Sequence, residues 1–230
     1  MRLDQAKRDY YRRRAREEGY RSRAAFKLKQ MDEKYHLMQR GSKIVDIGSA
    51  PGGWLQVASE LVGNVGLVVG VDLDHVETVS KNTLILQTDI LAPDFSQKVL
   101  TSLHNAKADC VLADLSPKLS GVWDIDHYKQ IDLCHSVADV LPFILENGGS
   151  SVMKVFQGDE LKGLVDRLKK SFARVEISKP DASRKESSEV YLVGLNFSGL
   201  VPKRPSESLS SLHQSEGNWD SSASDWQRSP

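Results

Sequence analysis

The chain has 230 residues, of which 40% are hydrophobic and 27% are charged. This length accommodates one α/β domain with a full hydrophobic core and is short for two independent domains. The sequence has no run of about 18 apolar residues and no short apolar stretch behind a basic start, so we expect a soluble, cytoplasmic protein without membrane contact.

The charges of the chain are unevenly distributed. The formal net charge is zero, which argues against a generally basic nucleic-acid binder. Residues 1–40, however, carry 13 Lys and Arg against six Asp and Glu, and Tyr10, Tyr11 and Tyr20 lie among them. Cations for phosphate contacts next to aromatic faces are typical of RNA binding, although a solvated helix explains the composition about equally well.

A helix and five strands are predicted next. The helical pattern opens at Ser22–Leu28 and ends near Gly41. Short runs rich in β-branched residues then predict strands at Lys43–Ile47, Val65–Val71, Thr83–Gln87, Ala108–Ala113 and Ser150–Val155. The segments between these runs are long enough for crossover helices, so we expect a parallel sheet that is buried on both faces.

The end of the domain has a different pattern. A helix is predicted from about Asp159 to Ser171, followed by strands at Ala173–Ile177 and Val190–Phe197. Because no helix separates these two strands, we expect an antiparallel pair at the sheet edge.

Residues 198–230 are rich in polar residues and poor in aliphatic ones, so we expect a mostly disordered tail. A docking role for Trp219 and Trp226 within this tail stays open. The chain thus divides into a basic helical segment at 1–40, a core domain at 41–197 and the tail.

The two cysteines, Cys110 and Cys134, lack CxxC or metal-ligand spacing. We expect both to be buried free thiols, and we expect no metal site.

A glycine-rich turn between the first strand and the next helix indicates a cofactor site. Gly48, Gly52 and Gly53 allow the backbone to approach a ligand closely. Asp72 follows the second strand, where a carboxylate can accept hydrogen bonds from a ribose diol. Pro51 removes a backbone donor that a pyrophosphate would use, which favours a cofactor without phosphate, such as S-adenosylmethionine, over NAD or FAD.

Other residues near this turn have two interpretations each. Asp89 can accept from an adenine amino group while Ile90 packs on the ring, but a helix cap or loop role is commoner for such an aspartate. Asp46 is interpreted as a structural carboxylate that holds the glycine turn. Trp54 contacts the cofactor or fills the core.

Three ionisable residues are predicted to meet at the carboxyl edge of the sheet. Asp114 follows the fourth strand, at the edge where open α/β sheets bind ligands. Lys154 ends an almost wholly apolar strand, so it needs an ion-pair partner or must lose its charge. Glu189 opens the last, antiparallel strand, whose start lies at the same edge. Taken singly, each residue is more often part of a surface ion pair.

Five sequence blocks resemble a known family. They are Ser22–Leu28, Gly48–Trp54, Ala113–Pro117, Met153–Gly158 and Lys179–Arg184. From about Tyr20 to Val193 the chain resembles the FtsJ/RrmJ (RlmE) family of ribosomal RNA 2′-O-methyltransferases. The resemblance implies a Rossmann-like class I S-adenosylmethionine-dependent methyltransferase fold: an α/β fold with a seven-stranded, mostly parallel sheet, an antiparallel last strand and helices on both faces.

The resemblance also implies the functional residues. The family's catalytic tetrad falls on Lys27, Asp114, Lys154 and Glu189, with Lys154 as the expected proton acceptor. The expected cofactor-binding residues are Gly48, Ser49, Pro51, Gly52, Gly53, Trp54, Asp72, Leu73, Asp89, Ile90 and Asp114. The expected RNA-binding residues are Arg12, Arg13, Arg21, Arg23, Lys179 and Arg184.

The function that this resemblance implies is S-adenosylmethionine-dependent methylation of RNA at a ribose 2′-oxygen. The implied substrate is a uridine of large-subunit ribosomal RNA in the peptidyl-transferase region, bound by a monomeric enzyme. Two alternatives stay open: methylation of tRNA, and a non-catalytic RNA-binding module for ribosome assembly. A nucleotide-dependent oxidoreductase is disfavoured because the glycine turn does not suit phosphate.

Overall fold

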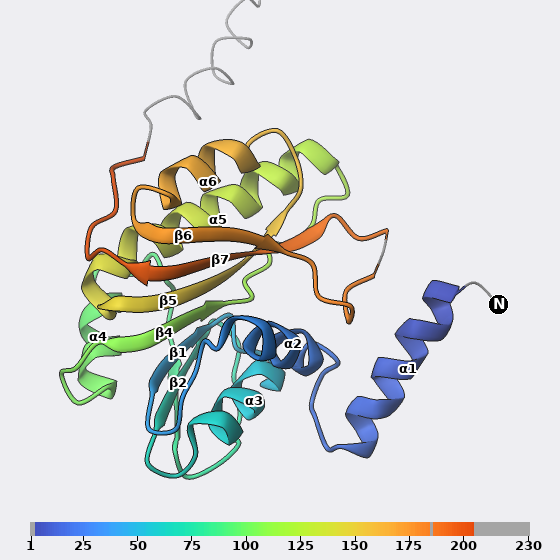
Figure 1. The fold of residues 1–230 in the computed structure, drawn as a ribbon, viewed down its shortest axis with the longest axis horizontal. Coiled ribbons are helices and arrows are strands. Elements are labelled where there is room, and N and C mark those ends of the chain that lie inside the picture. Colours follow the sequence, from blue (N-terminus) through green and yellow to red (C-terminus); the bar gives the residue numbers. More distant parts are fainter. Residues whose placement is uncertain (1–2, 185, 205–230) are drawn as a thin grey trace, which may run out of the picture.

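The computed structural model describes residues 3–184 and 186–204 (Figure 1). Its helices are α1 (Leu3–Glu17), α2 (Ala25–Tyr35), α3 (Gly53–Val62), α4 (Phe95–Ser102), α5 (Trp123–Ile144) and α6 (Leu161–Leu168). Its strands are β1 (Lys43–Ile47), β2 (Leu67–Asp72), β3 (Thr83–Gln87), β4 (Ala108–Ala113), β5 (Leu145–Phe156), β6 (Phe172–Ser178) and β7 (Glu189–Phe197).

The strands form one seven-stranded sheet in the order β3-β2-β1-β4-β5-β7-β6. Strands β1 to β5 pair in parallel, and β7 runs antiparallel to both of its neighbours, β5 and β6. The expected mostly parallel sheet with an antiparallel last strand is therefore confirmed. The chain winds outward in both directions from β1 and β4, and this switch point is where open α/β sheets bind ligands.

Helices cover both faces of the sheet, as expected (Figure 1). The face covered by α4, α5 and α6 and the face covered by α2 and α3 each have their own cluster of buried apolar side chains. Within β4, Val111 and Ala113 belong to the first cluster, and Cys110 and Leu112 belong to the second. Since strands of this kind are apolar on both faces, they appear in the sequence as unbroken hydrophobic runs.

Some element boundaries differ from the predicted ones. The helix predicted to end near Gly41 ends at Tyr35, because His36 adopts a left-handed conformation with φ of 51° and its N–H caps the last turn. Strand β5 begins at Leu145, not at Ser150, since the chain passes from α5 into this strand without a loop. The two last strands pair at the sheet edge as predicted, with β6 outermost.

The predicted disordered tail, with Trp219 and Trp226, lies outside the described residues from residue 205 onward. Residues 198–204 follow β7 and reach α6, where the Arg167 guanidinium donates to the Pro202 carbonyl oxygen at 2.8 Å. None of the helices in the described part of the chain has the length and apolarity to cross a membrane.

Both cysteines are buried and free, as predicted. Burial raises the pKa of the Cys134 thiol to about 12, so this group is an inert part of the core. Within residues 3–184 and 186–204, no group of three or more His, Cys, Asp or Glu side chains is arranged to hold a metal ion.

Candidate active site

The predicted tetrad lies on the α2 and α3 face of the sheet. Asp114, Lys154 and Glu189 each stand two residues from a side chain that belongs to the core cluster of this face. Because side chains alternate between the faces of a strand, all three point to the same side. Lys27 approaches them from α2, where it is 7% exposed. The structure therefore brings the four predicted residues together.

Lys154 and Asp114 form a buried pair. The Lys154 ammonium lies 3.1 Å from the Asp114 Oδ1 atom and donates to the Asp114 backbone oxygen at 2.9 Å. Burial raises the pKa of the Asp114 carboxyl, and the charges of Lys154 and Lys27 only partly oppose this effect. Lys154 is 8% exposed, so its charge has few contacts with water. Lys154 was expected to have an ion-pair partner or to lose its charge, and the structure places Asp114 as that partner.

The backbone of Lys154 is also held. Its carbonyl oxygen accepts a hydrogen bond from the Gln130 Nε2 atom at 2.7 Å and another from the Cys134 Sγ atom at 3.2 Å. Gln130 is fully buried and also donates to the Leu115 carbonyl oxygen at 3.2 Å. One side chain of α5 thus links the end of β5 to the loop after β4. This role of Gln130 was not predicted, because a single glutamine within a helical pattern does not indicate which groups its side chain will contact.

The second pair in the tetrad joins Lys27 to Glu189 and includes Tyr191. The Lys27 ammonium donates to Glu189 and, at 3.0 Å, to the Tyr191 hydroxyl, which in turn donates to Glu189 at 2.6 Å. Although burial acts to raise it, the pKa of Glu189 is lowered by the Lys27 charge and by these hydrogen bonds. Burial raises the pKa of Tyr191 far above its ordinary value. Glu189 is therefore ionised in this cluster, and Tyr191 stays neutral.

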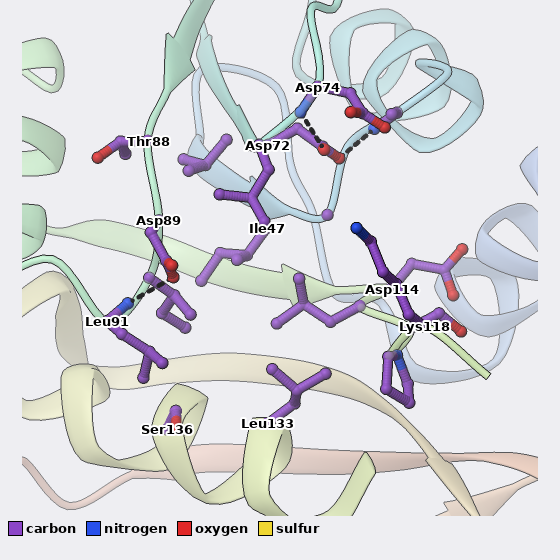
Figure 2. Close-up of a pocket in the computed structure, with 18 of the residues that line it drawn as sticks. Ile47, Asp72, Asp74, Thr88, Asp89, Leu91, Asp114, Lys118, Leu133 and Ser136 are labelled. Carbon is purple, nitrogen blue, oxygen red and sulfur yellow. Dashed lines mark hydrogen bonds between the residues drawn. The ribbon is translucent and has the colours of Figure 1, made fainter. Parts of the chain in front are cut away.

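A cavity of about 710 Å³ lies at the carboxyl ends of β1, β2 and β4, beside Asp114 (Figure 2). Six of the predicted cofactor residues line it: Gly48, Asp72, Leu73, Asp89, Ile90 and Asp114. Its volume falls within the roughly 300 to 1,000 Å³ that is usual for small-molecule sites. The cavity can therefore hold a nucleoside-sized cofactor against the tetrad.

The carboxylates of the cavity have definite partners. Asp72 accepts from the Ala50 backbone N–H at 2.8 Å and from the Asp74 backbone N–H at 2.9 Å, as Figure 2 shows. Asp89 accepts from the Leu91 N–H at 2.9 Å. Each carboxylate thus shapes its own loop, and its remaining lone pairs can still serve a ligand.

The other predicted cofactor residues, Ser49, Pro51, Gly52, Gly53 and Trp54, do not line this cavity. Trp54 is buried, its indole N–H donates to the Ala24 carbonyl oxygen at 2.9 Å, and its ring centre lies 5.6 Å from that of Tyr191. Of the two interpretations of Trp54, these contacts fit the one in which its side chain fills the core. Packing against Tyr191 connects Trp54 to the tetrad and not to the cofactor cavity.

Two glycines of the turn are approached by the protein's own chain. A Cβ atom on Gly53 would lie 2.2 Å from the Ser22 Oγ atom, and one on Gly52 would lie 2.6 Å from the Arg21 guanidinium. Gly52 also has a φ of 109°, which side chains rarely allow. The segment between α1 and α2 thus packs directly on the glycine turn.

We expect Gly53→Ala to destabilise the fold by about 1 to 3 kcal/mol, because the new methyl group overlaps Ser22 in a packed region. Gly163→Ala is the matched control: it lies within α6 with open space around it, and alanine there is expected to stabilise by about 0.5 to 1 kcal/mol. Urea unfolding of both variants measures the difference. Equal stability of the two variants would contradict the packing of Ser22 on the turn.

The interpretation of Asp46 as the residue that holds the glycine turn is wrong. Asp46 is fully buried, and within the described residues neither of its carboxylate oxygens has a hydrogen-bond partner. The turn is held instead by Asp72 and by the N–H groups of Gly48 and Ser49, which donate to the Val71 carbonyl oxygen at 2.8 and 3.2 Å. Burial, reinforced by nearby carboxylates, raises the pKa of Asp46 well above its ordinary value.

Part of the cavity lining was not predicted. One strip of α5 contributes Lys129, Asp132, Leu133 and Ser136. Their spacing places them on one helix face. That amphipathic pattern was a usable signal, but it gives no indication that the polar face meets a ligand instead of solvent.

The predicted RNA-binding residues have different surroundings. Arg12 and Arg13 are exposed on α1, and Arg184 is exposed in the loop between β6 and β7. Lys179, in the same loop, donates to the Ser187 carbonyl oxygen at 2.8 Å. The charge of Arg23 acts on Tyr191, so Arg23 lies near the tetrad.

The Arg21 side chain connects three loops through hydrogen bonds to backbone oxygens. Its guanidinium donates to the carbonyl oxygens of Glu77 at 2.6 Å, Thr78 at 3.2 Å and Pro51 at 3.3 Å. These bonds tie the segment after α1 to the glycine turn and to the loop after β2.

Comparisons with known proteins agree with this geometry. The sequence model of the FtsJ-like methyltransferase family matches residues 20–197. The chain is 46% identical over 186 residues to the ribosomal RNA large subunit methyltransferase E of Methanothrix thermoacetophila. This match covers 81% of the present chain and 71% of the relative. It is 43% identical over 199 residues to the enzyme of that name in Nitrosopumilus maritimus, covering 86% of this chain and all of the relative.

Among solved structures, a ribosomal RNA methyltransferase of Plasmodium falciparum matches with a TM-score of 0.70 and 29% identity, covering 79% of this chain and 100% of that one. Fibrillarin in its complex with Nop5p has a TM-score of 0.53 at 18% identity, covers 74% of this chain and 81% of its own, and shares the fold. The chain described here therefore belongs to the FtsJ-like methyltransferase family, with S-adenosylmethionine as its methyl donor.

Proposed function

We propose that this protein methylates a ribose 2′-hydroxyl in large-subunit ribosomal RNA, at a uridine of the peptidyl-transferase region. The position of Asp114 carries the proposal: its carboxylate pairs with Lys154, and the same residue lines the cavity. A hydroxyl group placed at Lys154 would therefore lie beside a methyl donor held in the cavity. The names of the two relatives, large subunit methyltransferases from different archaea, support this class of RNA.

S-adenosylmethionine supplies a methyl group that its positively charged sulfur activates for transfer. In the cavity, Asp72 would accept hydrogen bonds from the ribose hydroxyls. Asp89 would accept from the adenine amino group, and the apolar side chain of Ile90 would pack against the ring. These residues stand at the carboxyl ends of neighbouring strands and face a common space, which fits a nucleoside that carries no phosphate.

Lys154 is the proposed proton acceptor. Its Nζ atom would take the 2′-hydroxyl proton while that oxygen bonds to the methyl carbon and the bond between this carbon and the sulfonium sulfur breaks, which would leave a neutral thioether. Asp114 would orient the Nζ atom, which lies 3.1 Å from the Asp114 Oδ1 atom. Lys27, held by its ion pair with Glu189, would place a cation beside the ribose. Alignment of the reacting atoms contributes several kcal/mol more.

The proposed RNA path runs along α1 and the loop between β6 and β7. Both segments stand at the edge of the sheet where the parallel strands end (Figure 1). Arg12 and Arg13 on α1 and Arg184 in the loop are exposed, so they are suited to phosphate contacts. We further propose that the enzyme acts as a cytoplasmic monomer on an assembled or assembling subunit.

The function is tested with radiolabelled S-adenosylmethionine and large ribosomal subunits from cells that lack this enzyme. We expect label on one ribose 2′-oxygen of the large-subunit RNA, located by mapping of the product. Label on tRNA alone would replace the substrate assignment. Binding to subunits without any methyl transfer would favour the non-catalytic assembly module.

Asp72→Ala is expected to weaken S-adenosylmethionine binding by about 10- to 150-fold, since hydrogen bonds to a charged group contribute about 1.5 to 3 kcal/mol. The variant loses the ribose acceptor and also the anchor of the Ala50 N–H. Asp74→Ala, at the exposed rim of the same cavity, is the control and should bind nearly as the wild type does. Titration calorimetry with both variants measures the difference, and unchanged affinity of Asp72→Ala would remove Asp72 from the cofactor site.

A further inference from the structure

Several large apolar side chains are exposed on the loop after Asp114 and on the first turns of α5. They are Leu119, Val122, Trp123, Ile125 and Tyr128, each at least 40% exposed. Trp123 is the largest of these side chains, with 49% exposure.

Trp123 packs against the rings of buried His127 and half-buried Phe156. Its ring is nearly parallel to that of His127, with centres 6.0 Å apart and an angle of 14°, and its centre also lies 6.0 Å from that of Phe156. His127 is buried and packs closely against Gly158, where a Cβ atom would lie 2.5 Å from the imidazole ring. These two ring contacts fix the position of the indole, and about half of Trp123 remains exposed to solvent.

The location of Trp123 relates it to the tetrad. Phe156, which contacts Trp123, stands two residues after Lys154 in β5, about 7 Å further along the strand. The loop that leads to Trp123 starts at Asp114. Trp123 thus lies beside the end of the strand that carries the proposed proton acceptor.

The charges nearby indicate which part of an RNA would face Trp123. Asp124 is exposed next to it, and Asp126 accepts hydrogen bonds from Ser120 and Gly121 at the start of α5. These two carboxylates, partly offset by the charge of Lys129, disfavour a phosphate group at this place. An uncharged base face suits both the aromatic ring and the local charge, because unpaired bases in RNA commonly stack on aromatic side chains.

We propose that Trp123 stacks on an unpaired base of the substrate RNA, next to the ribose presented to Lys154. The inference rests on the proposed function and adds a base-binding surface to it. Trp123 would hold the RNA without touching the reacting atoms, so it contributes to RNA binding and not to the chemical step.

The test compares Trp123→Ala, Trp123→Leu and Trp123→Phe, with large subunits as the methyl acceptor. Loss of stacking should raise the KM for subunits by about 5- to 150-fold in the alanine and leucine variants, the range that one stacked base contributes. Phenylalanine should recover most of the affinity, and kcat and S-adenosylmethionine affinity should stay unchanged. The matched control is Phe143→Ala, an exposed aromatic side chain about 30 Å away at the other end of α5.

A purely apolar contact, whether within the protein or to a protein partner, predicts that leucine replaces tryptophan as well as phenylalanine does. That result, or an equal effect of Phe143→Ala, would overturn the inference. Filter binding of the same variants to single-stranded polyuridylate, without cofactor, provides a readout that does not depend on methylation. If wild-type protein methylated no large-subunit RNA, the proposed function would fail, while the order of these affinities would still decide whether Trp123 stacks on bases.

Discussion

Replacing Lys154 by alanine is expected to lower the rate of methyl transfer by about 10²- to 10⁴-fold, the usual contribution of a positioned acid or base. The reason is that the variant has no group to take the 2′-hydroxyl proton. Affinity for S-adenosylmethionine should persist, because Lys154 does not line the cofactor cavity. Single-turnover methyl transfer, with cofactor binding measured separately by calorimetry, distinguishes loss of chemistry from loss of the site.

Lys154→Arg sharpens this test. An arginine keeps the positive charge and can pair with Asp114, but its guanidinium does not give up a proton in proteins. If Lys154 acts only as a cation, the arginine variant should retain most of the activity; if it acts as a base, this variant should be as slow as alanine. Lys162→Met, which removes a lysine that is 85% exposed on α6, is the control for general effects of charge.

The centre of the sheet was predictable because β1, β2 and β4 are largely buried on both faces. The mostly apolar runs of β1 and β4 gave correct boundaries, since such runs are typical of parallel strands between two helical layers, and the boundaries of the partly exposed strand β3 were correct as well. The extension of β5 back to Leu145 was not predictable, because Glu146, Asn147 and two glycines dilute the apolar pattern there. In the structure Leu145 pairs with Ala108 and Ser150 with Cys110, and the four residues between them lie in a register shift of the ladder with β4.

The tetrad was predictable from topology and family resemblance together. The residues at strand ends meet at one edge in any sheet of this type, so Asp114, Lys154 and Glu189 had to be neighbours. Which residue pairs with which was not predictable. The hydrogen bonds of Tyr191 and Gln130 depend on side-chain positions that only the packed structure defines.

The glycine turn shows a limit of motif reasoning. Its glycines were interpreted as room for a ligand, and Gly48 does line the cavity, but Gly52 and Gly53 give room to the protein's own Arg21 and Ser22. A sequence motif indicates that something approaches the backbone closely. It does not indicate whether that group belongs to a cofactor or to the same chain.

Asp46→Asn is expected to change how stability depends on pH. In the folded protein the pKa of Asp46 is raised well above the ordinary value, first because the carboxyl is fully buried and then because of the charges of Asp114 and Asp72. Below the ordinary value of about 3.9, both the folded and the unfolded chain hold the proton, and its stabilising effect is fully present. As the pH rises toward the folded pKa, only the unfolded chain releases the proton, so stability falls.

The wild type should therefore lose about 1.4 kcal/mol of unfolding free energy per pH unit through this one group, over the range in which only folded Asp46 keeps its proton. An asparagine does not titrate, so the stability of Asp46→Asn relative to wild type should increase steadily with pH. Urea unfolding at intervals from pH 5 to pH 8 measures the slope. The slope, and not the stability at one pH, is the decisive quantity, because the buried amide adds a constant cost of its own.

Asp166→Asn is the matched control, because hydrogen bonding to Lys162 lowers the pKa of the exposed Asp166 carboxyl. Stability from a lowered pKa is present above the ordinary value and is lost only as the pH falls through the folded one, so this variant should differ from wild type by a constant amount from pH 5 to pH 8. If Asp46→Asn gave a flat difference as well, Asp46 would be ionised in the folded protein at neutral pH. Its negative charge would then lie in the core near Asp114.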